Sequence, residues 1–135
     1  MKHFGDITKI FGYDLPVVDI ITGGSPCQDL SVAGKRAGLA GERSGLFMEA
    51  VRIIKEMRKA TNGMYPTFAL WENVPGAFSS NKGRDFQTVL TEIVRIAEPN
   101  AADVPLFGGA KSWSKSGALM GVDANGCYFS IAYRL

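Results

Sequence analysis

Two short polar segments of this chain carry side chains that are able to do covalent chemistry on a substrate. The first, Gly23-Gly24-Ser25-Pro26-Cys27-Gln28, holds a cysteine, and the second, Trp71-Glu72-Asn73-Val74-Pro75, holds a glutamate. A cysteine thiolate is a strong nucleophile, but with a free pKa of about 8.5 only a few per cent of the thiol is ionised at neutral pH. A neighbouring carboxylate would raise that pKa further, so Cys27 and Glu72 make better chemical sense on different atoms of one substrate.

Taken singly, neither residue identifies a function. A lone cysteine in a loop is more often structural than catalytic, and a glutamate after a strand is more often a helix cap or a surface residue. A Cys-nucleophile hydrolase or a phosphate-binding protein is disfavoured, because His3 near the terminus is the single histidine and no GK[ST] follows the glycines. Cys27 and Cys127 lie in no CxxC or Cys/His cluster, so we expect no metal site.

The elements that must position these residues follow from the apolar pattern. Residues 17–22 are β-branched and nearly all apolar, which predicts a strand buried on both faces of a parallel sheet. Residues 23–45 contain six glycines and no period, which predicts a long functional loop. Helical spacing predicts a helix over 46–60, with Ser44 as its N-cap and Asn62-Gly63 as its stop.

The second half of the chain repeats this order. Residues 67–71 are predicted to form a buried strand, and a helix follows whose apolar face spans residues 86–94. We expect residues 98–126, rich in Gly, Pro, Ser and Ala, to be irregular, and residues 127–135 to form a third strand. Strand, helix, strand, helix indicates an α/β fold with a parallel sheet, in which Cys27 and Glu72 open onto the same edge.

Length and charge set the remaining limits. A chain of 135 residues is expected to form one domain, and its net charge of +2 does not by itself indicate a polyanion partner. The basic residues nearest the two polar segments fit either phosphate contacts or a solvated loop; they are Lys35, Arg36, Arg43, Lys82 and Arg84. No signal peptide and no apolar run of about 20 residues is present. We therefore expect no membrane association and a cytoplasmic location.

The two polar segments resemble the signatures of one enzyme family. Residues 23–36 are similar to the GGxPCQxxSxAGxR motif of the DNA (cytosine-5)-methyltransferases, and residues 71–75 are similar to the ENV motif of that family. His3-Phe4-Gly5-Asp6-Ile7 is similar to its shorter GDI motif, so the resemblance covers roughly residues 3–96. It implies an incomplete Rossmann-like methyltransferase domain with a mostly parallel sheet, encoded by a bacterium or a phage.

The resemblance also implies a reaction and roles for individual residues. The family methylates carbon 5 of cytosine in double-stranded DNA with S-adenosylmethionine, on a base flipped out of the duplex. Cys27 would add to carbon 6 of the ring, and Glu72 would hydrogen-bond or protonate ring nitrogen 3. The remaining matches place Pro26 at the nucleophile turn beside the cofactor and Asp6 at the cofactor adenine. They also place five residues near the DNA or the target base: Gln28, Ser31, Arg36, Asn73 and Val74.

Several parts of the family pattern have no counterpart in these 135 residues. The glycine-rich first cofactor motif, the acidic ribose ligand, the QxRxR motif and the target-recognition region are absent. We therefore expect residues 1–135 to be a partial catalytic domain that is inactive alone and that binds a complementing chain or associates with itself. The alternative is a non-catalytic DNA-binding or interaction fragment of a phage or restriction-modification methyltransferase.

Overall fold

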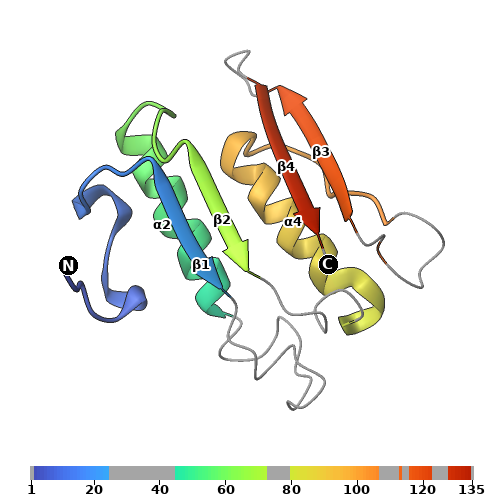
Figure 1. Ribbon diagram of the computed structural model, residues 1–135, viewed down its shortest axis with the longest axis horizontal. Helices are drawn as coiled ribbons and strands as arrows, with labels where there is room; N and C mark the ends of the chain where they lie inside the picture. The colour runs from blue at the N-terminus through green and yellow to red at the C-terminus, as the bar shows by residue number, and fades with distance from the viewer. Residues whose placement is uncertain are drawn as a thin grey trace.

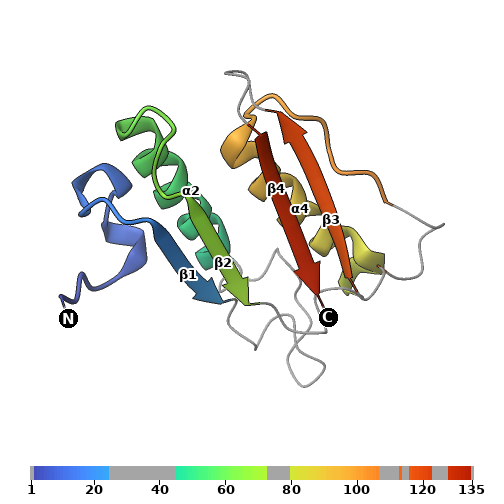
Figure 2. The same ribbon diagram turned by 45° about the horizontal axis from the view of Figure 1, so that its top comes forward.

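The protein folds into two layers, with the strands in one layer and the two long helices in the other (Figures 1 and 2). The computed structural model describes residues 2–24, 45–72, 80–106, 113, 116–122 and 128–134. In chain order the elements are η1 Ile7–Lys9, η2 Gly12–Asp14, β1 Ile20–Gly24, α2 Gly45–Ala60, β2 Phe68–Glu72, η4 Ser80–Gly83, α4 Arg84–Ala97, β3 Ser116–Val122 and β4 Tyr128–Arg134.

The helix α2 forms where the apolar spacing predicts it. Its buried face includes Phe47, Val51 and Ile54, which recur one turn apart. The helix ends at Ala60, and the left-handed residues Asn62 and Gly63 turn the chain away, with φ of 51° and 82°. The predicted cap Ser44 lies outside the described residues. Among the described residues, no helix is long and apolar enough to cross a bilayer.

The helix α4 supplies the other half of the core. Phe86, Val89 and Leu90 are buried on one face of it, as their spacing predicts. The ring of Trp113 packs edge-on against Phe86 with 5.1 Å between centroids, and its indole N–H donates to the Gly83 carbonyl at 2.9 Å. The chain after α4 therefore returns to cover the start of that helix.

The first two strands pair in parallel, as expected, but they are not buried on both faces. Side chains alternate along the pair, so Ile20, Phe68 and Leu70 point away from the helices and are 57%, 64% and 68% exposed. The expectation of a doubly buried strand was wrong because the described α-helices lie in one layer (Figure 1), with α2 packed against β1 and α4 against β4. The start of the predicted strand was also wrong, since Val17 and Val18 precede β1 and are exposed.

The expectation of a mostly parallel sheet needs correction as well. The described strands form two sheets of two, β1 with β2 in parallel and β3 with β4 antiparallel. β4 confirms the expected third strand, but β3 lies within residues predicted to be irregular. Its inward positions include Gly117 and Gly121, which hide the alternation that identifies a strand. A Cβ at Gly117 would lie 2.5 Å from the Tyr133 hydroxyl oxygen, so the glycine makes room for that ring.

Candidate active site at the ends of two parallel strands

The parallel pairing brings the two polar segments to one edge of the protein. Gly24, the last residue of β1, is the register partner of Glu72, the last residue of β2. Cys27 follows three residues after Gly24, so the chain that leads to Cys27 leaves β1 beside Glu72. In parallel sheets this carboxyl edge is where ligands bind. The arrangement of β1 and β2 therefore agrees with a shared site.

Most of the predicted site residues belong to segments that the structure does not describe. Residues 25–44 include Pro26, Cys27, Gln28, Ser31 and Arg36, and residues 73–79 include Asn73 and Val74; all of these lie outside the described residues. The described site residues are Asp6 and Glu72. The described part of the site is therefore its scaffold, formed by the ends of β1 and β2.

The side chain of Glu72 extends over the end of β1. A Cβ built on Gly24 would lie 3.5 Å from the Glu72 Cβ and 3.9 Å from its Oε2. Glu72 is exposed on the sheet face opposite the helices. Its carboxylate therefore lies beside the point from which the chain continues to Cys27.

The neighbouring residue fixes the direction of Glu72. Trp71 points toward the helix layer, where its ring packs edge-on against Phe47 with 5.2 Å between centroids. Because successive side chains of a strand alternate, an inward Trp71 directs Glu72 outward. Gly23 permits this packing, since a Cβ there would lie 2.4 Å from Cζ3 of Trp71.

Replacing Gly23 with alanine is expected to displace the Trp71 ring and to destabilise the fold by about 1–3 kcal/mol, the usual cost of overpacking. Urea unfolding with tryptophan fluorescence measures both effects. Gly45→Ala is the matched control, because a Cβ at Gly45 meets no atom within 4 Å. Equal stability of the two variants would contradict this account of how Glu72 is oriented.

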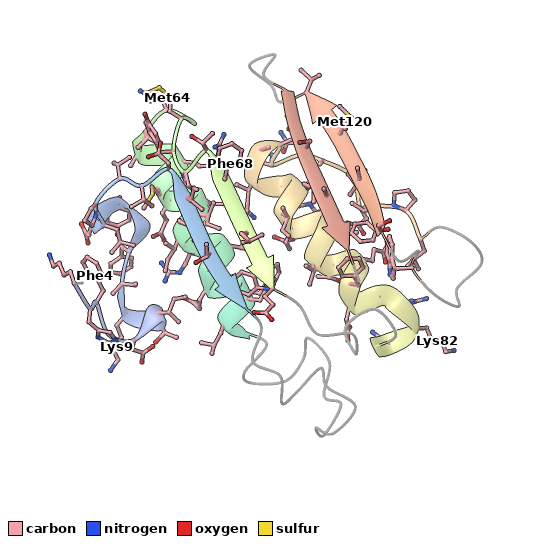
Figure 3. All side chains as sticks on the ribbon, viewed as in Figure 1. Phe4, Lys9, Met64, Phe68, Lys82 and Met120 are labelled. Carbon is pink, nitrogen blue, oxygen red and sulfur yellow. The ribbon has the colours of Figure 1, made fainter. Side chains whose placement is uncertain are left out.

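The N-terminal segment carries Asp6 at the start of η1. Asp6 caps η1, its Oδ1 accepting hydrogen bonds from the Thr8 amide at 3.0 Å and the Thr8 hydroxyl at 2.8 Å. The backbone bond first, and then the hydroxyl bond, hold the pKa of Asp6 below its ordinary value, so this exposed carboxylate is ionised at neutral pH. Lys9, at the end of η1, lies toward the end of the molecule to which β1 and β2 point (Figure 3).

A basic residue lies at that end too. Lys82 of η4 is exposed and lies at the end of the molecule to which β1 and β2 point (Figure 3). Its φ of 58° and that of Asn81, 48°, are in the left-handed region that non-glycine residues rarely adopt. Arg84 follows in the first turn of α4 and is exposed. Lys35, Arg36 and Arg43 fall in a segment that the structure does not describe.

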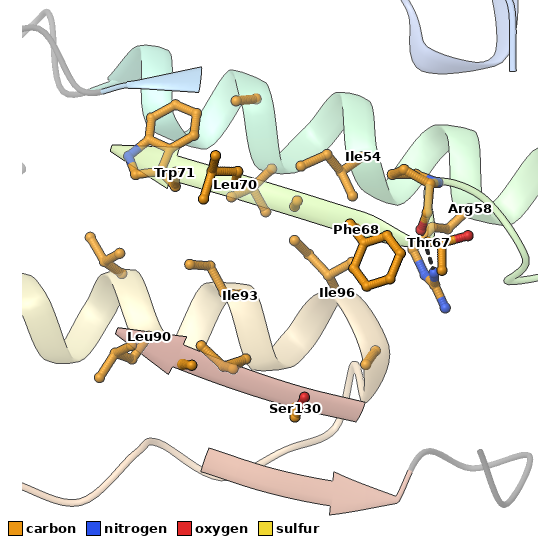
Figure 4. A pocket seen from close by; sticks show the side chains of 18 of the residues that line it. Ile54, Arg58, Thr67, Phe68, Leu70, Trp71, Leu90, Ile93, Ile96 and Ser130 are labelled. Atoms are coloured by element: carbon orange, nitrogen blue, oxygen red, sulfur yellow. Dashed lines mark hydrogen bonds between the residues drawn. The ribbon is translucent and has the colours of Figure 1, made fainter. Parts of the chain in front are cut away.

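A groove of about 890 Å³ lies elsewhere, between β2 and β4, with α2 and α4 also lining it (Figure 4). Its walls are mainly apolar and include Phe68 and Leu70 of β2 and Ile93 and Ile96 of α4. Among the described residues that line it, Arg58 is the one charged residue, and it donates to the Pro66 carbonyl at 2.9 Å. None of these described lining residues carries a thiol or a carboxylate.

Two residues that sequence reasoning missed connect α2 to the N-terminal segment. Arg52 and Glu56 form an ion pair at 2.8 Å, and both also bond to the backbone of residues 7–12. Attention to the apolar face of the helix left them out. The i, i+3 and i, i+4 spacing of Glu49, Arg52 and Glu56 was the available signal.

Comparison with known proteins agrees with the resemblance found in the sequence. The family model described as C-5 cytosine-specific DNA methylase matches residues 1–96. The chain is 46% identical over 92 residues to type II methyltransferase M1.ScrFI of Lactococcus lactis subsp. cremoris, covering 68% of this chain and 22% of that protein. It is 37% identical over 92 residues to type II methyltransferase M.BsuFI of Bacillus subtilis, covering 68% and 21%.

A phage protein is also similar. The orphan methyltransferase M.SPRI of Bacillus phage SPR is 42% identical over 81 residues, which cover 60% of this chain and 17% of that protein. The chain thus spans about a fifth of the length of the curated relatives it matches.

Proposed function

The chain belongs to the C-5 cytosine-specific DNA methylase family, and on that premise we propose that it supplies the nucleophile and the base-binding carboxylate for methylation of carbon 5 of cytosine in DNA. The observation that carries the proposal is the register of Gly24 with Glu72, because it starts the Cys27 loop beside the carboxylate. The fold would then be an incomplete Rossmann-like methyltransferase domain. The type II names of two relatives favour a restriction-modification context.

In the proposed reaction Cys27 and Glu72 act on different atoms of one ring. The Cys27 thiolate adds to carbon 6, while Glu72 hydrogen-bonds or protonates nitrogen 3 and draws electrons from carbon 6. The resulting enamine makes carbon 5 nucleophilic, so one hard step becomes two easier ones. After carbon 5 has been methylated, its proton is lost, the bond from carbon 6 to sulfur breaks, and the thiolate is regenerated.

S-adenosylmethionine, when bound, supplies the methyl group. Asp6 fits one contact with it, because an ionised carboxylate accepts a hydrogen bond from an adenine amino group. Both bonds from Thr8 reach Oδ1 of Asp6. We propose that Oδ2 of Asp6 accepts the hydrogen bond from the adenine amino group. We also propose that Pro26 shapes the nucleophile turn beside the cofactor.

Carbon 6 is inaccessible inside a stacked duplex, so the cytosine must be flipped out of double-stranded DNA. We propose that the long loop closes on the DNA with Gln28, Ser31 and Arg36, and that Asn73 and Val74 support Glu72 at the base. Lys82 and Arg84 would contact phosphates at the same end of the protein.

Replacing Lys82 with glutamine is expected to weaken DNA binding and to reduce the slope of log affinity against log salt concentration by about 1, the change for one lost phosphate contact. Fluorescence anisotropy at several salt concentrations measures this slope. Lys59→Gln is the matched control, because the end of α2 lies at the opposite end of the protein, where Arg58 bonds to Pro66 before β2 begins. An unchanged slope in the Lys82 variant would remove Lys82 from the DNA surface.

The 135 residues contain no counterpart of the glycine-rich cofactor motif, and we propose that they complete methyl transfer only together with a complementing chain that supplies it. They do hold the residues for the first half of the reaction. That half can be tested without a methyl donor, because addition of Cys27 to carbon 6 lets carbon 5 exchange its hydrogen with water.

The experiment uses an oligonucleotide whose cytosine carries tritium at carbon 5, at high protein concentration. Thiolate addition, protonation of carbon 5, loss of tritium and elimination of the thiolate leave cytosine unchanged and release tritium to water. We expect release above the buffer rate, and no methyl transfer when S-adenosylmethionine is added. Binding of the oligonucleotide without tritium release would favour the non-catalytic DNA-binding alternative, and methyl transfer by the chain alone would contradict the need for a partner.

A further inference from the structure

The guanidinium of Arg52 joins α2 to the segment that carries Asp6. Its Nη2 donates to the Ile7 carbonyl at 3.2 Å and to the Ile10 carbonyl at 2.9 Å. Nε and Nη2 donate to Oε2 of Glu49 at 2.9 and 2.7 Å, and Nη1 donates to Oε1 of Glu56 at 2.8 Å. Two glutamates of its own helix bind the planar guanidinium, which also binds the carbonyls of the first residue of η1 and of the residue that follows η1.

Glu56 binds the next turn of the same segment. Its Oε2 accepts a hydrogen bond from the Gly12 amide at 2.6 Å. Gly12 is buried, and a Cβ there would meet the Ile53 carbonyl oxygen at 2.1 Å, so the segment lies directly on the helix backbone. The ring of Phe11 lies over the Arg52 guanidinium at 5.7 Å. Residues 7–12 are thus fixed to α2 at three backbone groups.

The side chains of Arg52 and Glu56 are both charged at neutral pH. Partial burial raises the pKa of Glu56, but the Gly12 amide and Arg52 together outweigh it and hold the pKa below its ordinary value of 4.5. An exposed ion pair alone contributes little to stability. The hydrogen bonds from the charged Arg52 side chain to backbone carbonyls also fix the position of η1 on α2.

We propose that Arg52 is a positioning residue that fixes residues 7–12 on α2 and so places Asp6, the cap of η1, for cofactor binding. The inference rests on the proposed function, because the role of Asp6 comes from there. The same helix packs under β1, whose end leads to Cys27. The helix α2 thereby sets the positions of both β1, which leads to Cys27, and the segment that carries Asp6.

The chain offers a closely matched control in Arg95 of α4. Arg95 is 33% exposed and Arg52 is 30% exposed, and each pairs with a glutamate one turn earlier in its helix. Arg95 also donates to the Ala101 carbonyl at 3.2 Å and to Asp103 at 2.9 Å, so it fixes a different segment in the same manner. Arg95→Gln therefore removes comparable bonds without affecting the N-terminal segment.

The first measurement is amide hydrogen exchange in Arg52→Gln, Arg52→Lys and Arg95→Gln. For Arg52→Gln we expect the amides of Lys9 and Gly12 to exchange about tenfold faster while those of α4 are unchanged, the pattern of local opening. Arg52→Lys should give an intermediate rate, because an ammonium cannot reproduce the fork. Faster exchange throughout the chain would mean a general structural role and would overturn the inference.

The second measurement titrates the chain with S-adenosylhomocysteine at millimolar concentrations and follows the amide NMR signals of residues 5–9. We expect Arg52→Gln to bind about tenfold more weakly, because the ligand must then order the segment itself, and Arg95→Gln to bind as the unsubstituted chain does. If Arg52→Gln and the unsubstituted chain bind with equal affinity, the positioning role of Arg52 is overturned, while the proposed role of Asp6 stands. No binding by the unsubstituted chain would overturn the proposed role of Asp6, and with it the inference.

Discussion

Replacing Cys27 with serine is expected to abolish tritium release from carbon 5 of cytosine, a loss on the order of 10⁴-fold or more, as for other enzymes that lose their nucleophile. A serine hydroxyl has a far higher pKa than a thiol, so almost no alkoxide forms at neutral pH to add to carbon 6. The substitution replaces sulfur with oxygen and changes the side-chain volume little. The readout is the initial rate of tritium release at a saturating oligonucleotide concentration.

Cys127→Ser is the matched control, because it removes the other cysteine of the chain by the same atomic change. It should leave tritium release at the unsubstituted rate. Release that survives in Cys27→Ser, or that is lost in Cys127→Ser, would reassign the nucleophile.

Replacing Glu72 with glutamine is expected to slow tritium release by about 10²–10⁴-fold, the usual contribution of a positioned acid or base. Glutamine keeps the shape of the side chain and can still hydrogen-bond to nitrogen 3, but its amide cannot transfer a proton to that atom, so carbon 6 is less activated toward the thiolate. Binding of the oligonucleotide should weaken far less than the rate. The comparison therefore separates a chemical role of Glu72 from a role in DNA affinity.

The control for Glu72 is Asp19→Asn. Asp19 is an exposed carboxylate immediately before β1, at the end of the parallel pair opposite Glu72. The Asp19→Asn substitution removes a charge from the same sheet and should not affect the rate of tritium release. A Glu72→Gln variant as fast as Asp19→Asn would show that the glutamate is a surface residue.

The helices and the second strand follow from local pattern alone. The apolar spacing in α2 and α4 identifies their buried faces, and Asn62-Gly63 marks the turn after α2, because these features depend on neighbours within a few residues. β2 was likewise predicted within one residue at each end. The order of these elements was enough to place Glu72 at a carboxyl edge beside β1.

Features that depend on distant residues were not predictable in this way. β3 was not predicted because Gly117, one of its inward positions, has no apolar side chain. The Tyr133 ring, sixteen positions later and across the hairpin, occupies the space where a Cβ would lie. Val17 and Val18 have strong β propensity but lie before the register that pairs Ile20 with Phe68. The expectation of a doubly buried strand failed because it assumed a second helix layer that the described residues do not provide.

The candidate site shows the same division. The motifs predict Cys27, Glu72 and Asp6 as site residues, whereas the cluster of Arg52 and Glu56 depends on a contact between residues more than forty positions apart. That contact is visible once η1 and η2 lie on α2. The family motifs therefore predict the candidate site residues, and the packing shows which contacts hold the segment next to one of them, Asp6.

The most direct test of the central claim is a crystal structure of the chain with a cytosine oligonucleotide, in which the positions of the Cys27 sulfur and the Glu72 carboxylate are measured. The account predicts that one cytosine ring lies between them, with carbon 6 facing the sulfur and nitrogen 3 about 3 Å from the carboxylate. A sulfur and a carboxylate on opposite faces of the β1–β2 pair, or too far apart for one pyrimidine to reach both, would contradict it.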